Sequence, residues 1–102
     1  MDLRCPTCRA PWRGVVTCGR CGADLTMLMR VAVRAWELRE AARQALGDGD
    51  RVADAVMFAR TACRLHATPQ GQRLLGLALL ADKQVAEAYG VMERLLREEG
   101  QV

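Results

Sequence analysis

Aromatic side chains, lysine and histidine are scarce in this chain of 102 residues. Aromatic residues make up only 4% of it, so the core must be built from Ala, Leu, Val and Met. Such small aliphatic side chains favour close helix packing and argue against a β-sandwich. The longest apolar run, residues 74–81, is far shorter than the roughly 20 residues that cross a bilayer. We therefore expect a mainly α-helical fold without a membrane span.

The common catalytic motifs are also missing. The sequence has no Gly-rich phosphate loop, no HExxH motif and no Ser-containing nucleophile elbow. His66 lies near an expected helix end without an evident second and third partner for acid–base chemistry. Cys63 lies beside Ala59 and Ala62 on an apolar helix face, which favours a small buried side chain over a redox thiol. We expect no catalytic and no organic cofactor-binding residues, and hence no enzyme.

Charge is unevenly distributed along the chain. The whole sequence has 26% charged residues and a net charge of +3, but residues 1–46 hold eight arginines against four acidic residues, a charge of +4, which leaves −1 for the remainder. The basic half would suit an acidic partner or nucleic acid. An arginine-rich but merely solvated surface gives the same pattern. Because Lys83 is the only lysine and lies outside the basic half, a nucleic-acid site is the less favoured interpretation.

Four cysteines near the N-terminus carry the strongest chemical signal. They form two CxxC pairs, Cys5-Pro-Thr-Cys8 and Cys18-Gly-Arg-Cys21, separated by nine residues. Each pair can offer two sulfurs from one tight turn, and two such turns complete a tetrahedral site for zinc. Two disulfides and a rubredoxin-like iron site are the alternatives. The first residues contain no apolar secretory signal, so we expect a reducing, cytoplasmic compartment in which disulfides are disfavoured.

The pattern Cys-Pro-x-Cys, nine residues, Cys-x-x-Cys-Gly over residues 5–22 resembles the short zinc-ribbon family. This resemblance implies a structural Zn²⁺ ion held by Cys5, Cys8, Cys18 and Cys21. With four protein sulfurs the site has no open position, so the metal would not activate water. Iron is disfavoured because rubredoxin-like proteins separate their pairs by a longer, aromatic-containing segment.

The remaining pattern predicts one short strand or extended arm and four helices. Val15 to Thr17 should be extended, with Trp12 covering the metal sulfurs or bridging to the next helix. Hydrophobic periodicity predicts helices over residues 25–46, 51–66, 69–81 and 85–98. Caps are expected from Asp24 or Thr26, from Asp48 or Asp50, and from Thr68, and Gly47 should end the first helix. The inward faces should include Trp36, Val85, Ala88, Val91, Met92, Leu95 and Leu96.

A shift of 33 residues aligns apolar positions in the helical part. It pairs Ala42 with Leu75, Ala45 with Ala78, Leu46 with Leu79, Ala55 with Ala88, Ala59 with Met92 and Ala62 with Leu95. A period near 34 residues, and the segment Leu75-Gly76-x-Ala78 in particular, resemble the tetratricopeptide repeat. The resemblance implies antiparallel helical hairpins that bind protein segments. Arg43 stands where Gly76 stands in the second copy, so the first copy is degenerate. A plain four-helix bundle is the alternative.

These observations predict a zinc ribbon over residues 1–24 and a tetratricopeptide-like helical domain over residues 25–102. Two repeats seldom form a stable solenoid alone, so the ribbon should cap the array or the chain should form a homo-oligomer. The function that we expect is that of a small adaptor, assembly or regulatory protein that binds another protein or a larger complex. The alternative is a nucleic-acid-binding zinc ribbon associated with transcription or translation.

Overall fold

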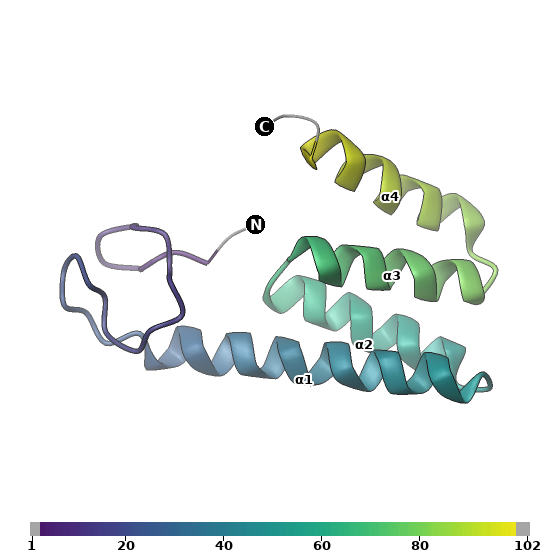
Figure 1. Cartoon of the computed structure of the whole chain (residues 1–102), viewed down its shortest axis with the longest axis horizontal. Coiled ribbons are helices and arrows are strands. Elements are labelled where there is room, and N and C mark those ends of the chain that lie inside the picture. The colour runs from purple at the N-terminus through teal and green to yellow at the C-terminus, as the bar shows by residue number, and fades with distance from the viewer. Residues whose placement is uncertain (1–2, 100–102) are drawn as a thin grey trace.

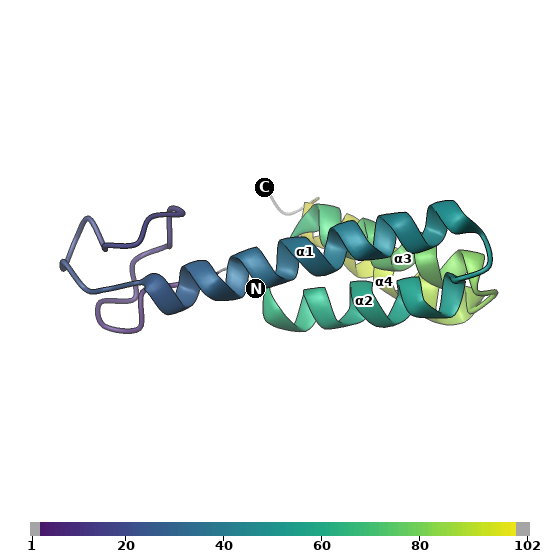
Figure 2. The same cartoon turned by 90° about the horizontal axis from the view of Figure 1, so that it is seen from below.

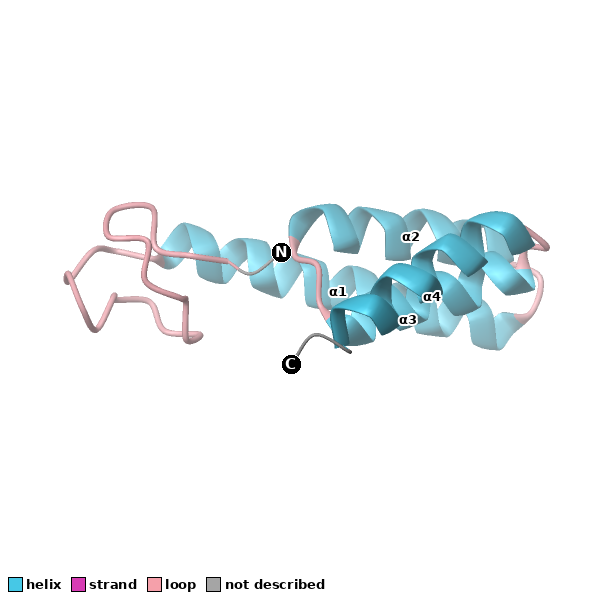
Figure 3. Cartoon of the chain, turned by 90° about the horizontal axis from the view of Figure 1, so that it is seen from above, coloured by secondary structure: helices cyan, strands magenta, loops and turns pink. Residues whose placement is uncertain are grey.

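The computed structural model describes residues 3–99 and is mainly α-helical, with no strand among these residues. The helices are α1 (Thr26–Asp48), α2 (Val52–Leu65), α3 (Pro69–Ala81) and α4 (Val85–Glu99). They follow one another as antiparallel neighbours, and an irregular segment that contains the four cysteines precedes them (Figures 1 and 3). The molecule is flat and elongated, 46 by 30 by 14 Å. Among residues 3–99, no helix is both long and apolar enough to cross a bilayer.

The helix bounds agree with the sequence to within a few residues, because local signals set most of them. Thr68 accepts a hydrogen bond from the Gly71 N–H at 3.0 Å and Pro69 opens α3, as expected. Asp24 accepts bonds from the Thr26 N–H at 3.0 Å and from its hydroxyl at 2.6 Å, just ahead of α1. These bonds lower the pKa of the Asp24 carboxyl, the Thr26 hydroxyl contributing most. The N-cap of α1 is nevertheless Leu25, which makes no side-chain cap bond, so neither Asp24 nor Thr26 occupies the cap position as expected.

Two further local predictions were wrong, and of the two alternatives for residues 15–17 the strand is not formed. Gly47 lies inside α1, and Gly49 takes the left-handed conformation instead (φ 78°), its N–H bonding the Leu46 carbonyl at 3.2 Å. Neither Asp48 nor Asp50 caps α2, since its N-cap is Arg51 without a side-chain bond. The expected strand over 15–17 is reduced to one isolated antiparallel bridge between Thr17 and Asp24.

The main core joins all four helices. Small residues let the helices approach closely: Ala42, Ala45, Ala55, Ala59, Ala78 and Ala88 are fully buried. Leu74, Leu75, Leu79 and Val91 fill the space between them. On α4 the inward positions are Ala88, Val91 and Leu95, whereas Val85 and Leu96, both expected inside, are 61% and 69% exposed. Trp36 on α1, also expected inside, is 56% exposed. Each of these three lies where no neighbouring helix covers its side of the bundle.

α1 is longer than its partners and carries the cysteine segment at its far end. Figures 1 and 2 show the first turns of α1 projecting beyond α2, α3 and α4, with the loops of residues 3–25 at the tip. A second apolar cluster forms there from Cys5, Cys18 and Leu25, with Cys8, Trp12, Ala23 and Leu28 packed against it. Among the described residues this cluster contains none from α2, α3 or α4. Capping of the helical array by the ribbon, one of the two alternatives expected, is therefore not seen.

Candidate metal centre

Residues 3–25, here called the knuckle, consist of two similar turns. In the first turn the Arg9 N–H bonds the Cys5 carbonyl at 2.8 Å, and in the second the Gly22 N–H bonds the Cys18 carbonyl at 2.9 Å. Each turn is closed by a further bond at 2.9 Å, from the Cys5 N–H to Ala10 and from the Cys18 N–H to Ala23. Each CxxC pair therefore lies in a backbone loop that fixes its two sulfurs on one side.

The two turns match at a constant offset of 13 residues. The isolated bridge Arg4–Pro11 corresponds to Thr17–Asp24, and the left-handed Arg9 (φ 63°) corresponds to the left-handed Gly22 (φ 78°). Trp12 and Leu25 also occupy equivalent positions, and both pack on the cysteine cluster. The knuckle is therefore a pseudo-symmetric pair of turns, each followed by one large apolar side chain that covers the sulfurs. This agrees with the expected covering role of Trp12.

The four sulfurs converge at the centre of this pair. Cys5 Sγ lies 3.6 Å from Cys21 Sγ, Cys8 Sγ lies 3.7 Å from Cys18 Sγ, and all four lie within 4.8 Å of one another. Four sulfurs at 2.3 Å from a tetrahedral ion would be about 3.8 Å apart. All five cysteines of the chain are free thiols. The arrangement thus matches a four-sulfur metal site and not a pair of disulfides.

The backbone of each turn points N–H groups at the sulfurs. N–H bonds from Cys8 and Thr7 lower the pKa of Cys5, and N–H bonds from Cys21 and Arg20 lower the pKa of Cys18 to about 6. The Ala23 N–H acts in the same direction on Cys21, but burial and bonds with the Cys5 and Cys18 sulfurs raise its pKa to about 12. Cys5 and Cys18 therefore lose their protons more readily than an ordinary thiol, whereas Cys21 resists ionisation because negative charge accumulates beside it. A bound cation would remove that obstacle.

The sequence identified all four cysteines but missed two features of the site. Arg9 adopts a left-handed backbone conformation, as Gly22 does. This conformation is expected of a glycine, but the residue types around Arg9 give no sign of it. Leu25 and Leu28 join the knuckle cluster although their periodicity belongs to α1. The 13-residue offset between the two CxxC pairs was the available signal for the equivalence of Trp12 and Leu25.

The other chemically capable residues are not gathered into a site. Cys63 lies on α2 among core residues, where burial raises the pKa of its thiol. His66 follows α2 directly. Within residues 3–99, the four cysteines form the only group of three or more His, Cys, Asp or Glu side chains that could hold a metal ion.

Known proteins give no further guidance on this arrangement. The chain matches no protein-family model, no curated protein and no solved structure.

Proposed function

We propose that this protein is a small non-catalytic adaptor whose cysteine knuckle holds a structural Zn²⁺ ion and whose helical hairpins bind another protein. The metal assignment is supported by the sulfur geometry and by four protein ligands, which leave no open position for a substrate or water. Zinc suits this set because it accepts tetrahedral thiolate ligands without redox chemistry.

The observation that carries the binding proposal is an uncovered apolar stripe on α4. Val85, Tyr89 and Leu96 are 61%, 69% and 69% exposed, and the partly buried Met92 lies between the last two. Steps of four, three and four residues place these side chains on one side of the helix. Exposed apolar stripes of this kind mark protein interaction sites.

The 33-residue repeat supports this assignment. Tyr89 corresponds to Val56 in α2, which is 6% exposed and belongs to the main core, and Met92 corresponds to the fully buried Ala59. The backbone of α2 lies against both α1 and α3, whereas that of α4 lies against α3 alone, with one ion pair between Arg60 on α2 and Glu87 at 2.7 Å. The stripe on α4 is therefore the counterpart of a surface that is covered in the first hairpin. We propose that the hairpins are tetratricopeptide-like and that a partner helix covers this stripe.

This proposal is tested with Tyr89→Ser/Leu96→Ser in the zinc-loaded full chain. The double variant should retain its helical circular dichroism and lose the proteins that the parent chain captures, as identified by mass spectrometry. Met27→Ser is the matched control, because Met27 is 67% exposed on α1 outside the stripe. Capture of the same proteins by the double variant would contradict the proposal. Concentration-dependent sedimentation of the parent chain alone reports whether the partner is a second copy.

A second candidate function is nucleic-acid binding through the knuckle. The observation in its favour is that Arg9, Arg13 and Arg20 are exposed and make no ion pair within residues 3–99. Phosphate contacts would then be strongly salt-dependent. A mobility shift with single-stranded and duplex oligonucleotides at low salt tests it, and the absence of a shift for both would exclude it.

A further inference from the structure

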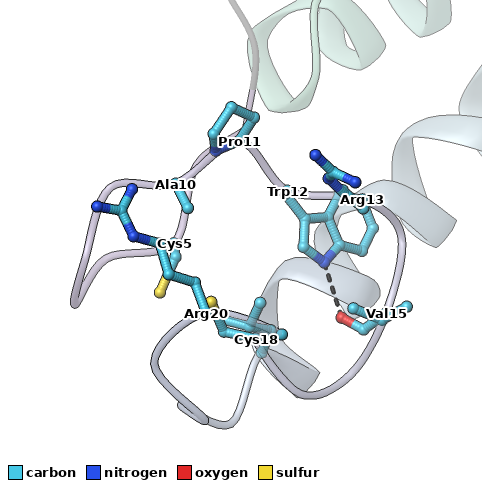
Figure 4. A pocket seen from close by; sticks show the side chains of 10 residues that line it. Cys5, Ala10, Pro11, Trp12, Arg13, Val15, Cys18 and Arg20 are labelled. Atoms are coloured by element: carbon cyan, nitrogen blue, oxygen red, sulfur yellow. Dashed lines mark hydrogen bonds between the residues drawn. The ribbon is translucent and has the colours of Figure 1, made fainter.

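The knuckle contains a cleft of about 640 Å³. It opens between the two metal-binding turns, with Trp12 and Val15 on one side and Cys5 and Arg20 on the other (Figure 4). Leu25, at the junction with α1, also lines it. Two of the proposed metal ligands, Cys5 and Cys18, lie in its lining, and the other lining residues are outside the ligand set.

The walls of this cleft suit an apolar side chain. Ala10, Pro11, Trp12, Val15 and Leu25 provide aliphatic and aromatic surface. The only indole N–H in the wall, that of Trp12, is already donated to the Val15 carbonyl at 2.8 Å. This bond also fixes the Trp12 ring against its own loop, so the wall is preorganised. Apart from the metal-binding thiols and two guanidinium groups, the lining side chains offer no polar group that could read a base edge.

The rim of the cleft is cationic and has no ion-pair partner among residues 3–99. Arg13 and Arg20 line it. Six other arginines, all on or next to the helical part, make ion pairs with carboxylates: Arg34, Arg43, Arg51, Arg60, Arg73 and Arg97. Within residues 3–25 the single carboxylate is Asp24, and its Oδ1 already accepts two bonds from Thr26. The positive charge of the rim is therefore available to an external anion.

We propose that this cleft binds an acidic segment of a partner protein, with one large apolar side chain inserted against Trp12 and its flanking carboxylates on Arg13 and Arg20. The proposal rests on the adaptor function and adds a second contact surface, at the opposite end of α1 from the hairpin turns. A peptide is favoured over nucleic acid because the wall offers a single aromatic face, whereas sites for single-stranded nucleic acid stack successive bases on aromatic side chains. Carboxylates can meet guanidinium groups in bidentate pairs.

The test uses the zinc-loaded full chain carrying Trp36→Phe, so that Trp12 is the only tryptophan and its emission reports on the cleft. The probe is a short synthetic peptide of aspartate and glutamate with one central leucine. We expect saturable binding with a change in Trp12 emission, weakened by added salt. Binding should be roughly tenfold weaker for Arg13→Ala/Arg20→Ala. Arg64→Ala/Arg94→Ala, which removes two exposed helical arginines, should leave it unchanged. Zinc content confirms that each variant keeps its knuckle.

Three outcomes would overturn this inference. The first is the absence of binding; the second is equal binding of a peptide whose leucine is replaced by serine, which would mean that charge alone is recognised. The third is tighter binding of a single-stranded oligonucleotide, which would assign the cleft to nucleic acid. The adaptor proposal is tested separately by the α4 variants. If those variants lose their protein partner while the cleft binds no acidic peptide, the inference fails and the adaptor function stands.

Discussion

At the scale of single residues, Arg9 and Gly22 hold equivalent left-handed positions in the two cysteine turns of the knuckle. A residue with a Cβ pays about 1–2 kcal/mol for this conformation, and glycine avoids that cost. Glycine also gives the unfolded chain more freedom, which offsets part of the gain. The first turn would therefore be more stable with glycine in place of Arg9.

We predict that Arg9→Gly stabilises the knuckle by up to about 1 kcal/mol and that Gly22→Ala destabilises it by about 1 kcal/mol. No atom lies within 4 Å of a Cβ built on Gly22, so the cost is one of backbone conformation alone. Competition for zinc against a chelator should show affinity changes of about fivefold in opposite directions. Gly19→Ala is the control, since Gly19 has equally open space without positive φ. Equal affinities for all three variants would refute the argument.

Cys63 allows a prediction about pH. Burial raises the pKa of its thiol, and the Arg39 charge opposes this effect only in part. Since the thiolate is the reactive form, alkylation of Cys63 by iodoacetamide should rise with pH along a curve displaced upward from that of an exposed thiol. Peptide mapping by mass spectrometry separates Cys63 from the knuckle cysteines. In urea the curve should return to the ordinary range, and an undisplaced curve in the native protein would contradict the assignment.

The spacing of residues along the chain predicts some features of the knuckle and not others. The convergence of the four cysteines was predictable because a CxxC turn is local, so the positions of its two sulfurs follow from the chain itself. The conformation of Arg9 was not predictable, because an arginine there opposes the intrinsic preference and only the metal-binding turn demands it. Trp12 was predicted to cover the sulfurs or to bridge to the next helix, and it packs on the sulfur cluster, as does Leu28 of α1.

At the scale of elements, the contact between α3 and α4 depends on Gly76. A Cβ at this position would lie 2.4 Å from Met92 Cε, 3.2 Å from its Sδ and 3.3 Å from its Cγ. Three atoms of one side chain would thus have to move. The absence of a side chain at Gly76 lets Met92 pack across the face of α3.

We predict that Gly76→Ala destabilises the chain by about 1 kcal/mol, since overpacking exceeds the gain in helix propensity. In a Met92→Ala background the same substitution should stabilise by about 0.5–1 kcal/mol. Gly90→Ala is the matched control, because Gly90 lies inside α4 with no atom within 4 Å of a built Cβ and should be stabilising in either background. Urea unfolding measures all six proteins, the two backgrounds and the four glycine variants. A stabilising Gly76→Ala in the parent chain would contradict the predicted clash.

Helix existence and bounds were predictable because capping groups, prolines and periodicity act over a few residues. Thr68 with Pro69 located the start of α3 correctly. The predictions that Trp36, Val85 and Leu96 face inward were wrong for a different reason. Periodicity shows which side of a helix is apolar, but only the tertiary arrangement decides whether another helix covers that side. On α4 the uncovered part became the proposed binding stripe.

At the scale of the whole molecule, the two apolar clusters share no residue. The knuckle cluster uses residues 5–28, and the main core begins at Ala42 of α1. Between them lies part of α1, whose first turns project past α2 and α3 (Figure 2) and on which Ala35 and Leu38 are buried. This separation could not be predicted from the sequence. The length of α1 was predicted correctly, but the helices that pack along each part of it were not. The metal should therefore stabilise one end of the molecule and not the other.

Removal of the metal tests this separation directly. Without an ion, the knuckle must be held by a small cluster of three buried residues, which is too little to offset the entropy of ordering its loops. We predict that chelation exposes the amides of residues 3–25 and of the first turns of α1 to rapid hydrogen exchange. The amides of α2, α3 and α4 should keep their protection, because their core contains no knuckle residue. Cys5→Ala should reproduce this pattern in the presence of zinc, whereas Cys63→Ala should not. Loss of protection in α2–α4 on chelation would show that the knuckle and the helices unfold as one unit, and the knuckle would then be part of the fold and not an appended binding tip.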